Sequence, residues 1–298
     1  MAPMARAEGG DAVAAPFERV AIVGFGLIGA SIALAVRGRW PSARLIAVDR
    51  KPVIDAAMRM QSADVGGEDL EIAAEADLIV LAAPVRANMR ILSELATHVA
   101  GEAVVTDVGS TKRQIALAAR ELPARLSFVG GHPLAGAAIG GLDAARPDLF
   151  TGRPWILTPP DDPGAAADRL SAFVEGLGAA VHLMSPEAHD VVVAYLSHLP
   201  QLTASALMHL VGERAGADGL SLAGRGLSDT TRLASSPADI WRDIAVTNQD
   251  NIAHAIDELV EILLRLKAGM QNGSDPLGTT FESAAHWKRV LEAGPDKP

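Results

Sequence analysis

The sequence predicts an α/β protein in which a Rossmann-type, doubly wound parallel sheet is followed by an all-α domain. From Arg19 to about Gly130, short apolar runs alternate with longer stretches of helical periodicity. From Ser185 to about Lys267 no convincing strand follows. Strands that alternate with helices form parallel sheets through right-handed crossovers, and strands covered on both faces lack polar alternation. A length of 298 residues suits two domains.

The first domain is expected to contain short buried strands separated by helices. The strands are expected at 19–24, 44–49, 77–84, 103–109 and 126–131, with two later ones at 153–159 and 180–184. The helices are expected at 27–37, 52–60, 85–98, 111–121 and 165–176. The chain then divides into a loose tail at 1–16, a dinucleotide-binding domain at 17–184 and a helical domain at 185–298.

The helical domain has clear start signals and more apolar surface than a small monomer needs. Ser185 with Pro186, and Ser236 with Pro237, are typical of helix N-termini. Pro200 predicts a kink, and the segment after Gly269 is expected to be a loop with a short helix at 280–292. The apolar positions occupy more than one helix face, which favours a homodimer through this domain; they are Leu202, Ala206, Leu210, Ile252, Ile256, Leu259 and Leu263.

Composition excludes several classes of function. The net charge of −10 argues against a protein that binds nucleic-acid phosphates. The absence of cysteine excludes disulfides, thiolate metal sites and a cysteine nucleophile. His189 and His198 lie about half a helical turn out of phase, so they do not form a helical metal pair and no metal site is expected. No signal peptide or apolar membrane segment is evident, so we expect a cytoplasmic protein without membrane contact.

A glycine-rich loop between the first strand and the first helix predicts a dinucleotide site. Gly24, Gly26 and Gly29 have the spacing that permits a tight turn, a close pyrophosphate and close helix packing, and Leu27 and Ile28 lie between them. Asp49 ends the next strand, where a carboxylate can accept both ribose hydroxyls of NAD. Arg50 could instead hold the 2′-phosphate of NADP, so NAD is the expected cofactor and NADP the alternative.

Other polar residues follow the expected strands at the edge where such sheets bind ligands. Ala83 and Pro84 are expected to line the cofactor, and Ser110, Lys112 and His132 to converge near the nicotinamide. A neutral histidine there can accept a hydroxyl proton while hydride leaves the same carbon. Purely structural roles also stay open, in which His132 stabilises a glycine-rich turn and Ser110 caps a helix.

The helical domain offers two further candidates. His198 interrupts an apolar helix, where a histidine is more often a core residue. Arg232 lies three residues after Asp229. The two form either a surface ion pair of little energy or an arginine that Asp229 holds toward a substrate carboxylate.

The order of the motifs is more specific than any one of them. GFGLIGAS, DVGSTK, GGHPLAG, WILTP, SHLPQ, DTTR and WRDI occur in this order. This arrangement resembles the prephenate/arogenate dehydrogenase family from about Arg19 to Lys267. The resemblance implies a Rossmann-type domain, a dimerising helical domain and NAD(P)-dependent oxidative decarboxylation in tyrosine biosynthesis. Prephenate would give 4-hydroxyphenylpyruvate, or arogenate would give tyrosine.

The resemblance also implies a role for each candidate. His132 matches the catalytic histidine that hydrogen-bonds the ring 4-hydroxyl, and Ser110 matches its partner. His198 matches a residue that positions the substrate, and Arg232 matches the arginine that binds a substrate carboxylate. Lys112 is a further candidate cation for a dianionic substrate.

Two departures leave the substrate open. Ala137 and Ala138 stand where relatives often carry Thr and Glu, and Thr230 stands where an aromatic residue often precedes Thr-Arg. Prephenate, arogenate and 4-amino-4-deoxyprephenate of secondary metabolism are therefore all considered. An oxidoreductase for a β-hydroxy acid or an imine, and a non-catalytic NAD-binding protein, are the competing hypotheses. Only about 30 residues follow Lys267, so we expect neither a fused chorismate mutase nor a regulatory domain.

Overall fold

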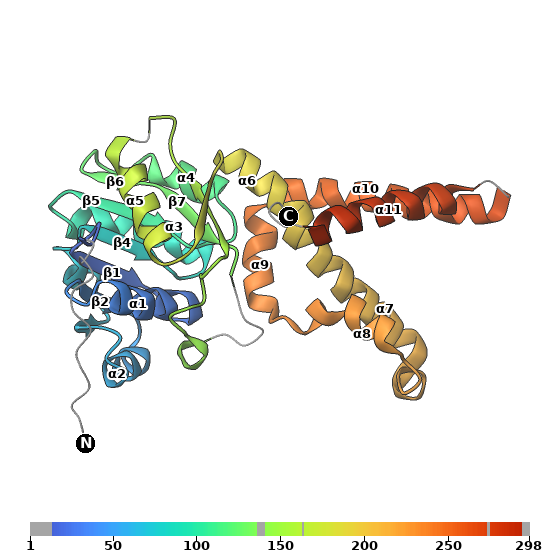
Figure 1. Cartoon of the computed structure of the whole chain (residues 1–298), viewed down its shortest axis with the longest axis horizontal. Helices are drawn as coiled ribbons and strands as arrows, with labels where there is room; N and C mark the ends of the chain where they lie inside the picture. Colours follow the sequence, from blue (N-terminus) through green and yellow to red (C-terminus); the bar gives the residue numbers. More distant parts are fainter. Residues whose placement is uncertain (1–13, 136–140, 163, 273–274, 294–298) are drawn as a thin grey trace, which may run out of the picture.

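The computed structural model describes residues 14–135, 141–162, 164–272 and 275–293, in an α/β domain joined to a helical domain (Figure 1). Ala137, Ala138 and most of the expected N-terminal tail lie outside these residues. The first domain contains a parallel sheet of six strands in the order β3-β2-β1-β4-β5-β6. The strands are β1 (Arg19–Val23), β2 (Arg44–Val48), β3 (Val65–Gly67), β4 (Leu78–Leu81), β5 (Ala103–Asp107) and β6 (Leu126–Phe128).

Helices cover both faces of this sheet, as the lack of polar alternation predicts. The alternate residues Val20 and Ile22 of β1 belong to the core shared with α1 and α5. Ala21 and Val23 belong to the core shared with α3 and α4. The expected doubly wound fold is therefore confirmed. The helices are α1 (Leu27–Arg39), α2 (Lys51–Arg59), α3 (Val85–His98), α4 (Arg113–Ala119) and α5 (Gly164–Gly176).

The structure differs from the expected strands in two places. The three-residue strand β3 and the 3-10 helix η1 (Leu70–Ala73) were not expected. The strand expected at 126–131 is two strands, because only β6 joins the parallel sheet. The chain continues as β7 (Gly130–Pro133), which pairs antiparallel with β8 (Pro154–Thr158), and β8 pairs parallel with β9 (Ala180–Leu183). The last two expected strands thus join β7 in a second, three-stranded sheet.

Two glycines allow β7 to lie between β5 and β8. A Cβ atom on Gly130 would be 2.4 Å from Oγ1 of Thr158, and one on Gly131 would be 2.6 Å from the backbone oxygen of Asp107. Neither distance is compatible with a side chain, so only glycine permits this close approach. The 3-10 helix η2 (Leu142–Ala144) lies between β7 and β8 in the chain.

The second domain is helical within the described residues. It contains α6 (Pro186–Val193), the π-helix η3 (Ala194–His198), α7 (Leu199–Leu220), α8 (Arg225–Thr230), the 3-10 helix η4 (Arg232–Ser235), α9 (Ala238–Thr247), α10 (Gln249–Asn272) and α11 (Pro276–Ala293). Ser185 caps α6 as expected, since its Oγ accepts a hydrogen bond from the Ala188 amide at 3.1 Å. The break expected near Pro200 is a π-helical turn just before it. The helix expected at 280–292 is confirmed but is longer, because α11 occupies 18 residues, and the loop expected directly after Gly269 is wrong because α10 continues to Asn272.

The long helices leave much apolar surface uncovered. In Figure 1, α10 and α11 run side by side away from the sheet. Several large apolar side chains of this domain are more than half exposed: Leu196, Leu210, Leu222, Leu263, Leu264, Met270, Phe281, Trp287 and Leu291. One continuous helical stretch, Pro186–Leu220, is long and apolar enough by composition to cross a membrane. That stretch carries the fully buried His189, Asp190 and His198, so one side of it packs within the protein.

Polar contacts join the helical domain to the edge of the α/β domain. Oγ1 of Thr111 lies 2.8 Å from Oγ1 of Thr247. The Arg113 guanidinium donates two hydrogen bonds to the Asp250 carboxylate, at 2.7 and 2.5 Å. These bonds bring the start of α10 to the start of α4, beside the strand ends.

Candidate active site

The loop between β1 and α1 has the backbone geometry that a bound pyrophosphate requires. Gly24 has φ +97°, a conformation that favours glycine, and its amide donates to the Val48 carbonyl at 2.9 Å. A Cβ on Gly24 would be 2.6 Å from the carbonyl carbon of Ala82, and one on Gly29 would be 2.1 Å from the Gly24 oxygen. Gly26 instead faces open space at the start of α1. The amides at this helix N-terminus are therefore accessible to an anion.

Two hollows lie on either side of the loop. The first has a volume of about 420 Å³, and its walls include Gly26, Leu27, Ile28, Ala83, Pro84 and Ser110. The second has a volume of about 590 Å³, and its walls include Gly24, Gly26, Asp49, Arg50, Ala83 and Pro84. The two share a wall, so they can take the two halves of one dinucleotide. Every predicted cofactor residue lines one of them except Gly29, which lies within α1 and acts through packing.

The second hollow presents a fixed carboxylate where a ribose is expected. Oδ2 of Asp49 accepts a hydrogen bond from the Phe25 amide, and Oδ1 accepts one from the Arg50 amide, both at 2.7 Å. The side chain of Arg50 is 86% exposed, whereas that of Asp49 is 19% exposed. The anchored group is thus the carboxylate, which suits the ribose diol of NAD better than a 2′-phosphate.

His132 lies in the middle of β7, opposite Ile156 of β8. The sequence predicts a loop position for His132, after a strand of the main sheet. This prediction is wrong, because His132 lies within β7, which belongs to the second sheet. The residue is 9% exposed, and its Nδ1 lies 2.8 Å from Nε2 of His189. Burial lowers the pKa of His132 well below 6.5, and the neighbouring His189, Lys112 and His198 lower it further. The imidazole is therefore neutral at neutral pH and can accept a proton.

Lys112 is not placed to bind a substrate carboxylate, contrary to expectation. The residue is fully buried, and its ammonium pairs with the Asp107 carboxylate and donates to the Gly131 carbonyl at 2.7 Å. Asp107 also accepts hydrogen bonds from the amides of Gly109 at 2.8 Å and Gly131 at 3.2 Å. The pair therefore ties the end of β5 to β7, next to His132.

His198 ends the π-helix η3 and is fully buried. Its Nδ1 lies 3.3 Å from Nδ2 of Asn248, which also donates to the Asp190 carbonyl at 2.8 Å. An amide nitrogen is a donor only, so Nδ1 of His198 is the acceptor and Nε2 carries the proton. Burial lowers the pKa of His198 to about 4. Nε2 is buried with no hydrogen-bond partner among the described residues, so it is an unsatisfied donor that a ligand acceptor reaching this position would satisfy.

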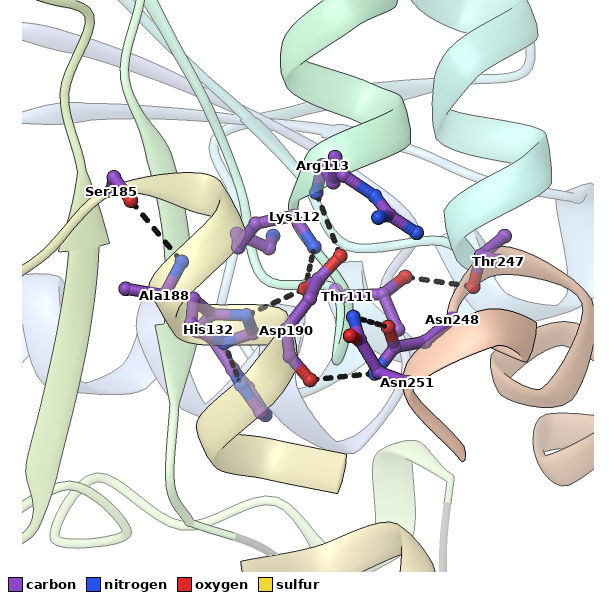
Figure 2. A network of polar contacts seen from close by, with 12 residues as sticks. Thr111, Lys112, Arg113, His132, Ser185, Ala188, Asp190, Thr247, Asn248 and Asn251 are labelled. Carbon is purple, nitrogen blue, oxygen red and sulfur yellow. Dashed lines mark hydrogen bonds and ion pairs between the residues drawn. The ribbon is translucent and has the colours of Figure 1, made fainter. Parts of the chain in front are cut away.

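Two residues at the centre of this network, His189 and Asp190, are not among the site residues that the sequence predicts. Nδ1 of His189 lies 2.8 Å from Oδ1 of Asp190. Figure 2 shows Asp190 between the backbone of Lys112 and Arg113 at the start of α4 and the side chain of Asn248. The only local signal was a His-Asp pair after a helix cap, and that pattern does not show that His132, 57 residues away, is its neighbour.

The other two predicted site residues form no hydrogen bond with this network among the described residues. Ser110 is half-buried and lines the 420 Å³ hollow. Arg232 begins η4 and is exposed. In the described part of the chain Arg232 forms no ion pair with Asp229, so the expected support from that carboxylate is wrong.

The arrangement can support proton removal beside a bound dinucleotide. A neutral, nearly buried histidine, a second histidine with a free N–H and a helix N-terminus that favours anions lie in one region. Among the described residues no group of three or more His, Asp or Glu side chains is placed to hold a metal ion. The chemistry that these residues fit is acid–base assistance to hydride transfer.

Comparison with known proteins gives the same answer. Residues 32–183 match the nucleotide-binding domain of prephenate dehydrogenase, and residues 185–281 match its dimerization domain. The prephenate dehydrogenase of Bacillus subtilis is 34% identical over 92% of this chain and 76% of its own length. The cyclohexadienyl dehydrogenase of Zymomonas mobilis is 30% identical over 85% of this chain and 89% of its own length.

Solved structures of a prephenate dehydrogenase and an arogenate dehydrogenase are similar to this chain along both domains. The prephenate dehydrogenase of Aquifex aeolicus, in complex with hydroxyphenyl propionate and NAD+, superposes with a TM-score of 0.84 at 29% identity, covering 92% of this chain and 98% of that one. The arogenate dehydrogenase of Synechocystis gives a TM-score of 0.79 at 31% identity, covering 92% and 99%. With both domains matched and relatives above 30% identity along almost all of the chain, this protein belongs to the prephenate dehydrogenase family.

Proposed function

We propose that this chain catalyses the NAD-dependent oxidative decarboxylation of prephenate, arogenate or both, in tyrosine biosynthesis. The observation that carries the proposal is the nearly buried His132, joined to His198 through His189, Asp190 and Asn248, in a protein whose glycine loop and Asp49 line two adjoining hollows. The relatives named prephenate, cyclohexadienyl and arogenate dehydrogenase support the substrate class.

The residues divide the chemistry between them. NAD, when bound along the glycine loop, supplies the acceptor for the hydride that leaves C4 of the ring. Nε2 of His132 takes the proton of the 4-hydroxyl, and Ser110 orients that hydroxyl. The ring carboxylate then leaves as CO2, and its bonding electrons complete the aromatic ring. The N–H of His198 and the guanidinium of Arg232 hold the anionic substrate.

The direct test is formation of NADH at 340 nm with prephenate and arogenate supplied separately, each with NAD and with NADP. Turnover of either substrate, faster with NAD, supports the proposal. A purified, folded enzyme that turns over neither substrate with either cofactor contradicts it.

Arg232→Ala should raise KM for the substrate by about 10- to 100-fold with little change in kcat. A guanidinium–carboxylate hydrogen bond of about 1.5–3 kcal/mol serves the ground state and the transition state alike. Arg214→Ala, which removes another exposed arginine of the helical domain, is the matched control and should leave KM unchanged. An unchanged KM in Arg232→Ala would place the carboxylate site elsewhere.

We further propose a cytoplasmic homodimer formed through the helical domain. The exposed apolar side chains on α7, α10 and α11 are the surface that a second copy would cover, and the matched family domain is a dimerization domain. Light scattering should give twice the 30.9 kDa chain mass at micromolar concentration. Leu263→Glu should weaken the dimer, and a wild-type mass of one chain would contradict the proposal.

A further inference from the structure

Asp190, His189 and His132 form a linear series of hydrogen-bonding side chains that leads to the reacting region. His189 and Asp190 are fully buried. Nδ1 of His189 lies 2.8 Å from Oδ1 of Asp190, and Nε2 of His189 lies 2.8 Å from Nδ1 of His132. Both ring nitrogens of His189 are therefore engaged by the protein, so this residue can influence the substrate only through His132.

The hydrogen bonds to Asp190 determine which ring nitrogen of His189 carries a proton. Oδ1 accepts a hydrogen bond from the Lys112 amide at 2.7 Å, and Oδ2 accepts one from the Arg113 amide at 3.0 Å. Figure 2 shows both bonds at the start of α4. With a backbone amide donating to each oxygen, the Asp190 carboxylate acts as an acceptor on both sides. The hydrogen bond to His189 therefore requires the proton on Nδ1 of His189.

The position of the proton on His132 follows from the charge of His189. Burial lowers the pKa of His189, although its hydrogen bond to Asp190 opposes that shift; the Lys112 ammonium lowers it again, and Asp107 raises it. His189 is thus neutral at neutral pH, with its single proton on Nδ1 and a lone pair on Nε2. Nδ1 of His132 must donate to this lone pair, which leaves Nε2 of His132 unprotonated.

We propose that His189 is a positioning residue that holds the proton of His132 on Nδ1, so that Nε2 is the nitrogen that accepts the substrate proton. Asp190 orients His189 in turn. When Nε2 of His132 takes the hydroxyl proton, its Nδ1–H continues to donate to His189, which stabilises the imidazolium. The inference rests on the proposed role of His132 and adds the reason why one of its two nitrogens is the base.

Two amide substitutions separate this role from simple packing. Glutamine at position 189 can place its carbonyl oxygen near the site of Nε2, so His189→Gln keeps an acceptor for His132. Asparagine is one methylene shorter and reaches only the site of Nδ1, so His189→Asn keeps the contact with Asp190 and loses the contact with His132. We expect kcat to fall by about 10- to 100-fold in His189→Asn and by only a few-fold in His189→Gln, with KM within about three-fold of wild type in both. Equal kcat losses in the two variants would overturn the proposal.

The tautomer itself can be measured without substrate or cofactor. ¹⁵N NMR of histidine-labelled free enzyme should show His132 protonated on Nδ1 in wild type and in His189→Gln, and shifted toward Nε2 in His189→Asn. A wild-type His132 protonated on Nε2 overturns the inference, even if neither variant folds. Failure of the proposed function would look different: the wild type would turn over no cyclohexadienyl substrate, while the NMR result would still stand.

Discussion

Replacing His132 with asparagine should lower kcat by about 10²- to 10⁴-fold, while the affinity for NAD stays close to that of the wild type. Asparagine fits the same strand position and can still hydrogen-bond, but it has no nitrogen that accepts a proton at neutral pH. The loss should equal the usual contribution of a positioned general base. His132 does not line either dinucleotide hollow, so cofactor binding should persist. NADH formation at 340 nm and calorimetric titration with NAD measure the two quantities.

The pH dependence of the wild type checks the same assignment. Burial and the neighbouring basic groups lower the pKa of His132 well below 6.5. The active, neutral form is therefore present above that lowered pKa, and kcat should decline only as the pH falls well below 6.5. His254→Asn removes an exposed histidine of α10 and serves as the matched control, with an unchanged kcat and profile. A His132→Asn enzyme with near-wild-type kcat would show that another group takes the proton.

The sequence was sufficient for the main sheet because its strands are continuous apolar runs bounded by helix signals. It was insufficient for β3, where Val65, Gly66 and Gly67 provide almost no apolar pattern. It also failed to separate β6 from β7, because a single residue, Val129, joins Leu126–Phe128 to Gly130–Pro133 and the apolar run continues up to the glycines. Hydrophobic periodicity indicates that a strand exists but does not say which sheet it joins.

In the candidate site, too, features formed by one segment follow from the sequence, whereas contacts between distant segments do not. The phosphate loop is a contiguous motif, so its geometry follows from its own residues. The contact between His132 and His189 depends on two domains meeting, and no spacing rule within one segment predicts it. For Lys112 the sequence supplied a charge but not its burial. A lysine after a strand end suggests a substrate contact, but the fold brings the Asp107 carboxylate and the Gly131 carbonyl within hydrogen-bond distance of its ammonium.

Lys112→Met should destabilise the protein by about 3–5 kcal/mol, because it leaves the Asp107 carboxylate buried without its ion-pair partner. Methionine has nearly the shape of the lysine stem, so the loss measures the charge and its hydrogen bonds rather than a cavity. Both side chains of the pair are fully buried, and the ammonium also holds the Gly131 carbonyl next to His132. Urea unfolding followed by circular dichroism gives the change in the free energy of unfolding.

Removing the charge of Asp107 as well should recover part of that stability. The Asp107→Asn/Lys112→Met double variant leaves no isolated charge, so it should be more stable than the sum of the two single losses predicts, by at least about 1 kcal/mol. The carbonyl oxygen of an asparagine at this position can still accept a hydrogen bond from the Gly109 or the Gly131 amide, both of which now donate to Asp107. Strictly additive losses, or a Lys112→Met loss below about 1 kcal/mol, would mean that the ammonium does not join β5 to β7. Lys112 would then again be available as a substrate cation, and a raised KM in the variant would detect that role.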